Sequence, residues 1–225
     1  MKRIEVKFCG MKNVQDAILA LSLGVSYVGF VVDVPESPRG VSGKDFFSLA
    51  REVKKNRSDA KVVAVTVDKS REELEEFLKS EFVDVLQLHG NESAELCAML
   101  KKIKEVWKAI NARDSDAIKK ASEFHQNADR ILLDTGNAQE KAKGTSDAFD
   151  AFEVFDKLKT QGIPLVLSGG LDEKNIVGYF RRLRPEIIDV SRGIESSPGE
   201  KSREKMKEFM NEVNEFNEFF TGHEL

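Results

Sequence analysis

Two side chains in this sequence have the chemistry of a proton-transfer pair. Cys9 ends the segment IEVKFC near the start of the chain, and Asp134 ends the segment RILLD. A thiol with a lowered pKa can act as a general base, and a carboxyl group can act as its acid partner. Each residue also has an ordinary alternative, since a lone strand cysteine is often a small core residue and Asp134 could cap a loop.

Two glycine-bearing turns could bind a phosphate group. LVLSGGLDEKN places Gly169 and Gly170 directly after an apolar segment, and DVSRGIESSPG places Gly193 after another. Glycines there let backbone N–H groups approach an anion, helped by a helix N-terminus. Either turn alone is a weak signal, but the two together predict a phosphorylated substrate. Arg39 in ESPRGVS could hold a carboxylate bidentately, or it could be a solvated loop residue.

These residues need a framework that brings strand ends together. Short segments rich in Val, Ile and Leu alternate with segments of helical periodicity, as in buried parallel sheets. We predict strands at residues 4–9, 27–32, 61–67, 84–89, 106–110, 130–134, 164–168 and 187–191. Eight such repeats in 225 residues predict an α/β fold, a single (β/α)8 TIM barrel over residues 1–225. A doubly wound open sheet is the alternative.

The expected helices have recognisable ends and faces. The first follows Asn13, an expected N-cap, and stops near Gly24. A later helix is expected to bury one face that also keeps Cys97 in the core, and a long amphipathic helix is expected near the end. The predicted apolar faces comprise Leu96, Met99, Leu100 and Ile103 in the former and Met206, Phe209, Met210, Val213 and Phe216 in the latter.

Strand alternation predicts which polar side chains face the barrel interior. In the first strand, Lys7 and Cys9 point inward while their apolar neighbours pack against the helices. The same alternation directs Gln87 and Asp189 inward on other strands. Because buried charges are costly unless paired, we expect Lys7 to contact Asp189 across the lumen, with Gln87 nearby. The alternative is that one of the pair reaches solvent at a barrel end.

Composition excludes several classes of function. The 35 basic and 39 acidic residues give a net charge of −4, which offers no electrostatic case for nucleic acid. The sequence contains no apolar run of the ~18 residues that a membrane helix needs, and the charged opening is unlike a signal peptide. Two cysteines cannot form a disulfide scaffold or a zinc site at their spacing. We therefore expect a cytoplasmic protein without membrane contacts.

Taken in order, the motifs resemble those of the phosphoribosylanthranilate isomerase family, barrel enzymes of tryptophan biosynthesis. The resemblance covers nearly the whole chain, and six segments in register make it specific. These segments are VKFCGMKNVQDA, GFVVDVPESPRGVS, LQLHGNE, ILLDT, LSGGLDEKNI and DVSRGIESSPGEKS.

The resemblance implies an Amadori rearrangement of N-(5-phosphoribosyl)anthranilate to the 1-amino-1-deoxyketose. Asp134 would be the general acid that opens the furanose ring, and Cys9 the general base that removes the C2′ proton. Arg39 would hold the anthranilate carboxylate, and His89 in QLHG would orient the site. No metal or organic cofactor is implied, and the chain would be a monomer or homodimer. The expected substrate-binding residues are Lys7, Arg39, His89, Ser168, Gly169, Gly170, Ser191, Arg192 and Gly193.

The sequence departs from the family pattern in three places. In KGTSDAFDA, Lys143, Ser146 and Ala151 replace two glycines and a tryptophan, within a region where residues 137–146 predict a mobile loop over the substrate. Arg192 replaces a serine in the last strand motif, and Gly40 replaces a frequent aromatic residue.

Two other functions remain open at this point. Another phosphosugar barrel enzyme would share the glycine turns but lack the Cys9 and Asp134 pair. A non-catalytic phosphate-binding barrel would bind a substrate analogue without turnover.

Overall fold

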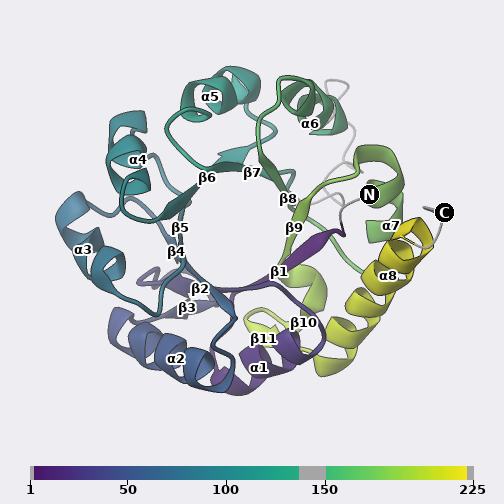
Figure 1. Ribbon diagram of the computed structural model, residues 1–225, viewed down its shortest axis with the longest axis horizontal. Helices are drawn as coiled ribbons and strands as arrows, with labels where there is room; N and C mark the ends of the chain where they lie inside the picture. Colours follow the sequence, from purple (N-terminus) through teal and green to yellow (C-terminus); the bar gives the residue numbers. More distant parts are fainter. Residues whose placement is uncertain (1–2, 137–150, 222–225) are drawn as a thin grey trace.

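The computed structural model describes residues 3–136 and 151–221. Within these residues, parallel strands form a closed ring surrounded by helices (Figure 1). The ring closes because β1 pairs with β2 on one side and with β9 on the other. The predicted (β/α)8 barrel is therefore confirmed, and the open sheet is excluded. The barrel strands are β1 (Glu5–Cys9), β2 (Tyr27–Val32), β4 (Lys61–Thr66), β5 (Val85–Leu88), β6 (Glu105–Asn111), β7 (Arg130–Asp134), β8 (Leu165–Ser168) and β9 (Ile187–Val190).

Three short strands were not predicted. The two-residue β3 (Gly40–Val41) extends the sheet beside β2. After β9, a 3₁₀ turn η2 (Arg192–Ile194) leads into an antiparallel hairpin of β10 (Glu195–Ser197) and β11 (Glu200–Lys201). Segments of two or three residues are too short to show the alternation by which a strand is predicted.

The helices cover the outside of the barrel. Asn13 caps the first as predicted, since its side chain accepts a hydrogen bond from the Asp16 N–H at 2.8 Å. Gly24 follows that helix with a φ of +97°, a left-handed conformation that favours glycine. Within the described ranges, no helix has the length and apolar character to cross a membrane. The helices are α1 (Val14–Ser22), α2 (Gly43–Asn56), α3 (Arg71–Lys79), α4 (Ala94–Lys101), α5 (Ala117–Phe124), α6 (Ala151–Thr160), α7 (Ile176–Leu183) and α8 (Arg203–Thr221).

The prediction for the buried face of α4 was partly wrong. The helix ends at Lys101, and Met99 and Ile103 are 42% and 56% exposed. The buried face instead contains Cys97 and Leu100, which lie three residues apart and so share one side of the helix. The core position predicted for Cys97 is confirmed, and so is the buried face of α8.

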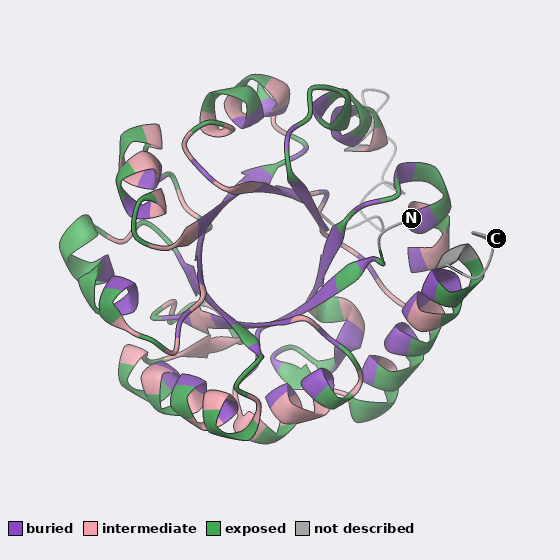
Figure 2. Cartoon of the chain, viewed as in Figure 1, coloured by how far each residue is buried: buried purple, intermediate pink, exposed green. Residues whose placement is uncertain are grey.

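Strand alternation divides the core into an inner and an outer layer. Side chains between strands and helices form the larger cluster, in which Phe8 of β1 meets Phe209 of α8 edge to face at 5.9 Å. Figure 2 shows buried residues along the strands of the ring and on the surrounding helices. A second cluster fills the barrel interior, where Tyr27 and Trp107 pack at 5.1 Å. Cys9 belongs to the inner cluster, as its position in the strand predicted.

Candidate active site

A cavity of about 330 Å³ lies at the C-terminal ends of the barrel strands. Its volume falls in the range of small-molecule sites. Its wall includes the last residues of β1, β7 and β8, so residues far apart in sequence meet in one place. Every predicted site residue except Lys7 lines this cavity: Cys9, Arg39, His89, Asp134, Ser168, Gly169, Gly170, Ser191, Arg192 and Gly193.

Lys7 is fully buried beneath the cavity and forms the predicted ion pair. Its Nζ lies 2.8 Å from Asp189 Oδ1. The contact does not cross the lumen as expected, because β1 and β9 are neighbours and Lys7 stands opposite Asp189 in their register. Gly29 on β2 makes room for the pair, since a Cβ there would lie 2.9 Å from Lys7 Nζ and 3.1 Å from Cys9 Sγ. Gln87, expected near this pair, contacts His89 instead.

Opposing effects act on the Cys9 thiol. Burial raises its pKa, and the nearby Asp189 carboxylate adds to that rise. The ammonium groups of Lys7 and Lys201 oppose it, but the net direction is upward. Lys7 keeps its charge, because its attraction to Asp189 and Cys9 outweighs its own burial and raises its pKa. Lys7 therefore lowers the free-energy cost of forming a thiolate without making the thiolate the resting form.

Asp134 is held at the rim by the neighbouring turn. Its Oδ1 accepts a hydrogen bond from the Gly136 N–H at 2.8 Å. Gly169, which follows β8, has a φ of +98°, and a Cβ at this position would collide with the Asp134 carboxylate. A glycine is thus required where the β8 turn approaches the carboxylate.

His89 stands where two cavities meet. Its Nδ1 lies 3.0 Å from Gln87 Nε2, and with the Gln87 amide in this orientation Nδ1 accepts the hydrogen bond and a neutral ring carries its proton on Nε2. Burial lowers the pKa of His89, although the carboxylates of Asp134 and Asp189 oppose that shift. The imidazole is therefore neutral near pH 7 and offers one N–H donor.

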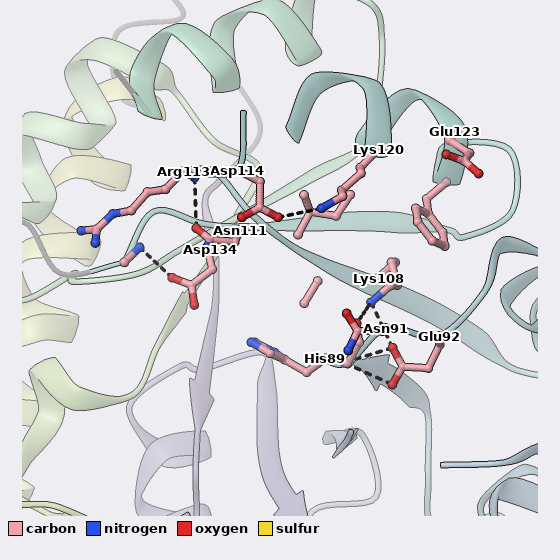
Figure 3. A pocket seen from close by; sticks show the side chains of 15 residues that line it. His89, Asn91, Glu92, Lys108, Asn111, Arg113, Asp114, Lys120, Glu123 and Asp134 are labelled. Atoms are coloured by element: carbon pink, nitrogen blue, oxygen red, sulfur yellow. Dashed lines mark hydrogen bonds and ion pairs between the residues drawn. The ribbon is translucent and has the colours of Figure 1, made fainter. Parts of the chain in front are cut away.

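A second cavity, of about 520 Å³, shares His89 and Asp134 with the first. It extends between the ends of β5, β6 and β7 and helix α5, and Figure 3 shows its polar lining. On its floor, Lys108 forms a buried ion pair with Glu92 at 3.0 Å. Lys108 also donates to the carbonyl of Gly90, so this pair braces the loop after β5.

The two predicted phosphate-binding turns pack against each other. Gly170 has a φ of +64°, and its carbonyl accepts a hydrogen bond from Asn175 Nδ2 at 2.7 Å. A Cβ on Gly193 would collide with the carbonyl of Leu171 in the other turn. This close contact places both turns on one side of the cavity. Arg192, where the family pattern has serine, also lines the cavity.

Arg39 lines the cavity but already has a carboxylate partner. Its Nε and Nη2 lie 2.8 Å and 2.6 Å from the two carboxylate oxygens of Glu195. Lys201 contacts the same carboxylate at 2.8 Å. Neither partner was predicted, although both lie within DVSRGIESSPGEKS, because the hairpin that carries them has no periodic hydrophobic pattern.

The other departures from the family pattern have mixed outcomes. Gly40 is explained by crowding, because a Cβ there would lie 2.6 Å from the carbonyl oxygen of Val34. The predicted loop at 137–146, with Lys143 and Ser146, lies outside the described residues, as does the side chain of Ala151. Among residues 3–136 and 151–221, no group of three His, Cys, Asp or Glu side chains could hold a metal ion.

Comparison with known proteins agrees with this architecture. The family model for N-(5'-phosphoribosyl)anthranilate isomerase matches residues 6–212. The N-(5'-phosphoribosyl)anthranilate isomerase of Sinorhizobium fredii is 34% identical over 215 residues, covering 94% of this chain and 93% of that protein. That of Caldanaerobacter subterraneus is 36% identical over 210 residues, covering 93% and 98%.

Solved structures give the same result. Phosphoribosyl anthranilate isomerase from Thermotoga maritima superposes with a TM-score of 0.81 at 29% identity, covering 94% of this chain and 99% of that one. A phosphoribosyl anthranilate isomerase in complex with reduced 1-(o-carboxyphenylamino)-1-deoxyribulose 5-phosphate gives a TM-score of 0.80 at 29% identity and the same coverage. With a family model that spans most of its length and relatives more than 30% identical, this chain belongs to the phosphoribosylanthranilate isomerase family.

Proposed function

We propose that this chain converts N-(5-phosphoribosyl)anthranilate to 1-(2-carboxyphenylamino)-1-deoxyribulose 5-phosphate by an Amadori rearrangement, with Asp134 as general acid and Cys9 as general base. The observation that carries the proposal is that both side chains line one cavity whose wall contains the two glycine turns. A thiol and a carboxyl group on the rim of a barrel can flank a small sugar, and the turns can receive its phosphate.

The reaction proceeds in three stages, which are ring opening, enolamine formation and ketonisation. Asp134 donates a proton to the furanose ring oxygen, the C1′–O bond breaks, and the amine nitrogen forms a protonated Schiff base with C1′. Cys9, as thiolate, removes the C2′ proton, and the electron pair forms the C1′–C2′ double bond of an enolamine. The enolamine then ketonises by losing its C2′ hydroxyl proton and gaining a proton at C1′. Atoms and electrons balance without an oxidant.

Lys7 assists the second step from below the cavity. Because burial raises the pKa of Cys9, the thiolate is costly until positive charge lies beside it. The Lys7 ammonium supplies one such charge, and the Schiff base supplies another at the moment when the base is needed. Asp189 holds Lys7 in place at 2.8 Å.

The remaining groups bind the two ends of the substrate. The turns at Gly170 and Gly193 receive the phosphate, with Arg192 as an added cation. Arg39 receives the anthranilate carboxylate through the N–H groups that Glu195 leaves available. His89 offers its Nε2–H beside Asp134, where it orients the sugar. We place this biosynthetic enzyme in the cytoplasm, as a monomer or homodimer.

The test is an isomerase assay with enzymatically generated phosphoribosylanthranilate as substrate. The change in fluorescence as the ketose forms is the readout. The native protein is expected to turn over, and its gene to rescue a tryptophan auxotroph lacking this step. Asp134→Asn is expected to lower kcat by ~10²–10⁴-fold while it still binds the reduced product analogue. Analogue binding without any native turnover would instead indicate a non-catalytic barrel, and turnover of another phosphosugar alone would indicate a different enzyme.

A further inference from the structure

One edge of the Arg39 guanidinium group is hydrogen-bonded to the carboxylate of Glu195. Glu195 accepts from Nε and Nη2, at 2.8 Å and 2.6 Å, in a bidentate arrangement. The side chains of Arg39 and Glu195 are 19% and 5% exposed. A bidentate pair of this kind fixes the plane of the guanidinium as well as its position.

This grip leaves a second edge of Arg39 available. A guanidinium has five N–H donors, and Glu195 uses one on Nε and one on Nη2. The end edge, formed by Nη1 and the other N–H of Nη2, has the same fork geometry. A second carboxylate can therefore bind Arg39 end-on while Glu195 stays in place. Because Arg39 lines the cavity, a ligand in the cavity can present such a carboxylate to it.

Lys201 adds a positive charge to the pair of Arg39 and Glu195. The charges of Arg39 and Glu195 alone sum to zero, and a neutral pair would attract an incoming carboxylate only weakly. Lys201 Nζ lies 2.8 Å from Glu195 Oε1, with its side chain 1% exposed, and as an ammonium group it brings the net charge to +1. Burial lowers the pKa of Lys201, but its hydrogen bond to Glu195 and its attraction to that carboxylate oppose the shift. It also donates to the carbonyl of Ser191 at 3.1 Å. Lys201 thus links the carboxylate partner of Arg39 to the turn that follows β9.

The charge of Glu195 is retained despite its burial. Burial alone would raise the pKa of this carboxyl group, but its hydrogen bonds to Arg39 and Lys201 bring the pKa below its usual range. The hairpin that carries the pair is itself anchored, because Lys205 Nζ donates to the Glu195 carbonyl at 2.7 Å. A Cβ on Gly199 in the same hairpin would collide with the carbonyl of Pro38, the residue before Arg39.

We propose that Glu195 and Lys201 are positioning residues that make Arg39 a fixed, net-positive receptor for the carboxylate on the substrate's N-substituent. The pair thereby sets the preference for a carboxylated aminoaldose phosphate over an uncarboxylated one. This inference rests on the proposed function, because it assigns Arg39 to the anthranilate end of the same cavity.

Two probes separate carboxylate recognition from phosphate recognition. One is reduced 1-(o-carboxyphenylamino)-1-deoxyribulose 5-phosphate, and the other is its phenylamino counterpart without the carboxylate. The ratio of their dissociation constants, measured by calorimetry, reports the contribution of the carboxylate alone. The native protein is expected to prefer the carboxylated probe by about ten- to a hundredfold.

Three variants test charge and position separately. In Lys201→Met, the preference for the carboxylated probe is expected to fall at least about tenfold, while the dissociation constant of the uncarboxylated probe stays within about threefold of native. Lys201→Arg is expected to retain the preference. The double variant E195Q/K201M restores the net charge of +1 but replaces the bidentate carboxylate partner of Arg39 with an amide that has one acceptor oxygen, so the preference is expected to stay low. Lys12→Met is the control, since Lys12 pairs with Glu200 on the exposed side of the same hairpin and is expected to have no effect.

Each outcome decides a different point. Native preference in Lys201→Met would overturn the role of Lys201. A native preference regained in the double variant would show that net charge suffices, and would overturn the positioning role of Glu195. A parallel loss of both probes in Lys201→Met would indicate a merely structural residue. Failure of the native protein to bind either probe would count against the proposed function itself.

Discussion

The barrel contains two buried groupings of a cysteine, a lysine and a carboxylate, one on each face of its sheet. The inner triad comprises Cys9, Lys7 and Asp189 in the barrel interior. The outer triad comprises Cys97, Lys108 and Glu92 between the strands and the helices. The lysine of each pair lies within 3.0 Å of its carboxylate. The same residue types thus occur twice. Cys9 and Asp189 of the inner triad line the cavity in which Asp134 faces the two glycine turns, whereas Lys108 and Glu92 of the outer triad line the second cavity.

The two triads differ in the face of the sheet on which they lie and in the groups that their lysines contact. Lys108 donates to the carbonyls of Leu88 and Gly90 as well as to Glu92, so all three of its protons have acceptors. Lys7 contacts Asp189 and also interacts with the thiol of Cys9. Strand alternation decides this outcome, because Lys7 points inward and Lys108 points outward. We therefore propose a catalytic use for these residue types on the inner face and expect a structural use on the outer face.

Replacement of the two cysteines should separate the triads most strongly. Cys9→Ser is expected to lower kcat by ~10²–10⁴-fold, because a hydroxyl is a far weaker acid than a thiol and cannot replace the base. Cys97→Ser is expected to leave kcat within about twofold, since Cys97 is sealed in the core and burial raises its pKa to about 11. Steady-state assays of both variants make the comparison. Near-native turnover in Cys9→Ser would refute the role of Cys9, and a large loss in Cys97→Ser would refute the distinction between the faces.

Replacement of the outer lysine should destabilise the fold rather than the chemistry. Lys108→Met leaves the buried Glu92 carboxylate without its cation, and such losses cost about 3–5 kcal/mol in the free energy of unfolding. Its kcat is expected to stay near native wherever the variant is folded. Urea denaturation followed by assay below the transition measures both quantities.

Lys101→Met is a matched control for this experiment. Lys101 also donates to a backbone carbonyl, that of Ala128, but its side chain is 34% exposed. The expected cost is therefore below about 1 kcal/mol. An unchanged denaturation midpoint in Lys108→Met would contradict a structural role for the outer triad.

The sequence predicts the inner triad better than the outer one, for a physical reason. Lys7 and Cys9 stand two residues apart in an alternating strand, so their shared face follows from strand geometry. Glu92 lies in a loop after β5, and its contact with Lys108 depends on how that loop folds back. Loop geometry has no period from which such a contact could be inferred.

The same limit applies within the candidate site. The ends of the strands predicted the positions of Cys9 and Asp134, because parallel strands present their C-terminal ends on one side of a barrel. Glu195 and Lys201 could not be predicted as partners, since their two short strands show no sequence pattern and are defined only by their pairing in the structure. The Lys7–Asp189 contact was predicted, but its direction was not, because that depends on the register between β1 and β9.

The pH dependence of the reaction should distinguish the triads most finely. If Cys9 acts as thiolate, kcat/KM rises with pH as the thiol ionises, and burial places this rise above the usual thiol range. Lys7→Met removes a cation that lowers the pKa, so the rise is expected to move to higher pH. Asp189→Asn removes an anion that raises the pKa, so the rise is expected to move to lower pH. Each shift should be about one pH unit.

The pH shifts expected for Lys7→Met and Asp189→Asn have opposite signs, so a general loss of folded structure could not produce both. A variant that merely loosens the barrel would lower kcat/KM at every pH without moving the rise. Lys201→Met should move the rise upward by a smaller amount, since Lys201 opposes the raised pKa less than Lys7 does. Lys108→Met should not move it, because its ammonium belongs to the outer triad. Thiolate absorbance measured in a Cys97→Ser background assigns the titration to Cys9, and shifts of the same sign for Lys7→Met and Asp189→Asn would contradict control of this thiol by its two charged neighbours.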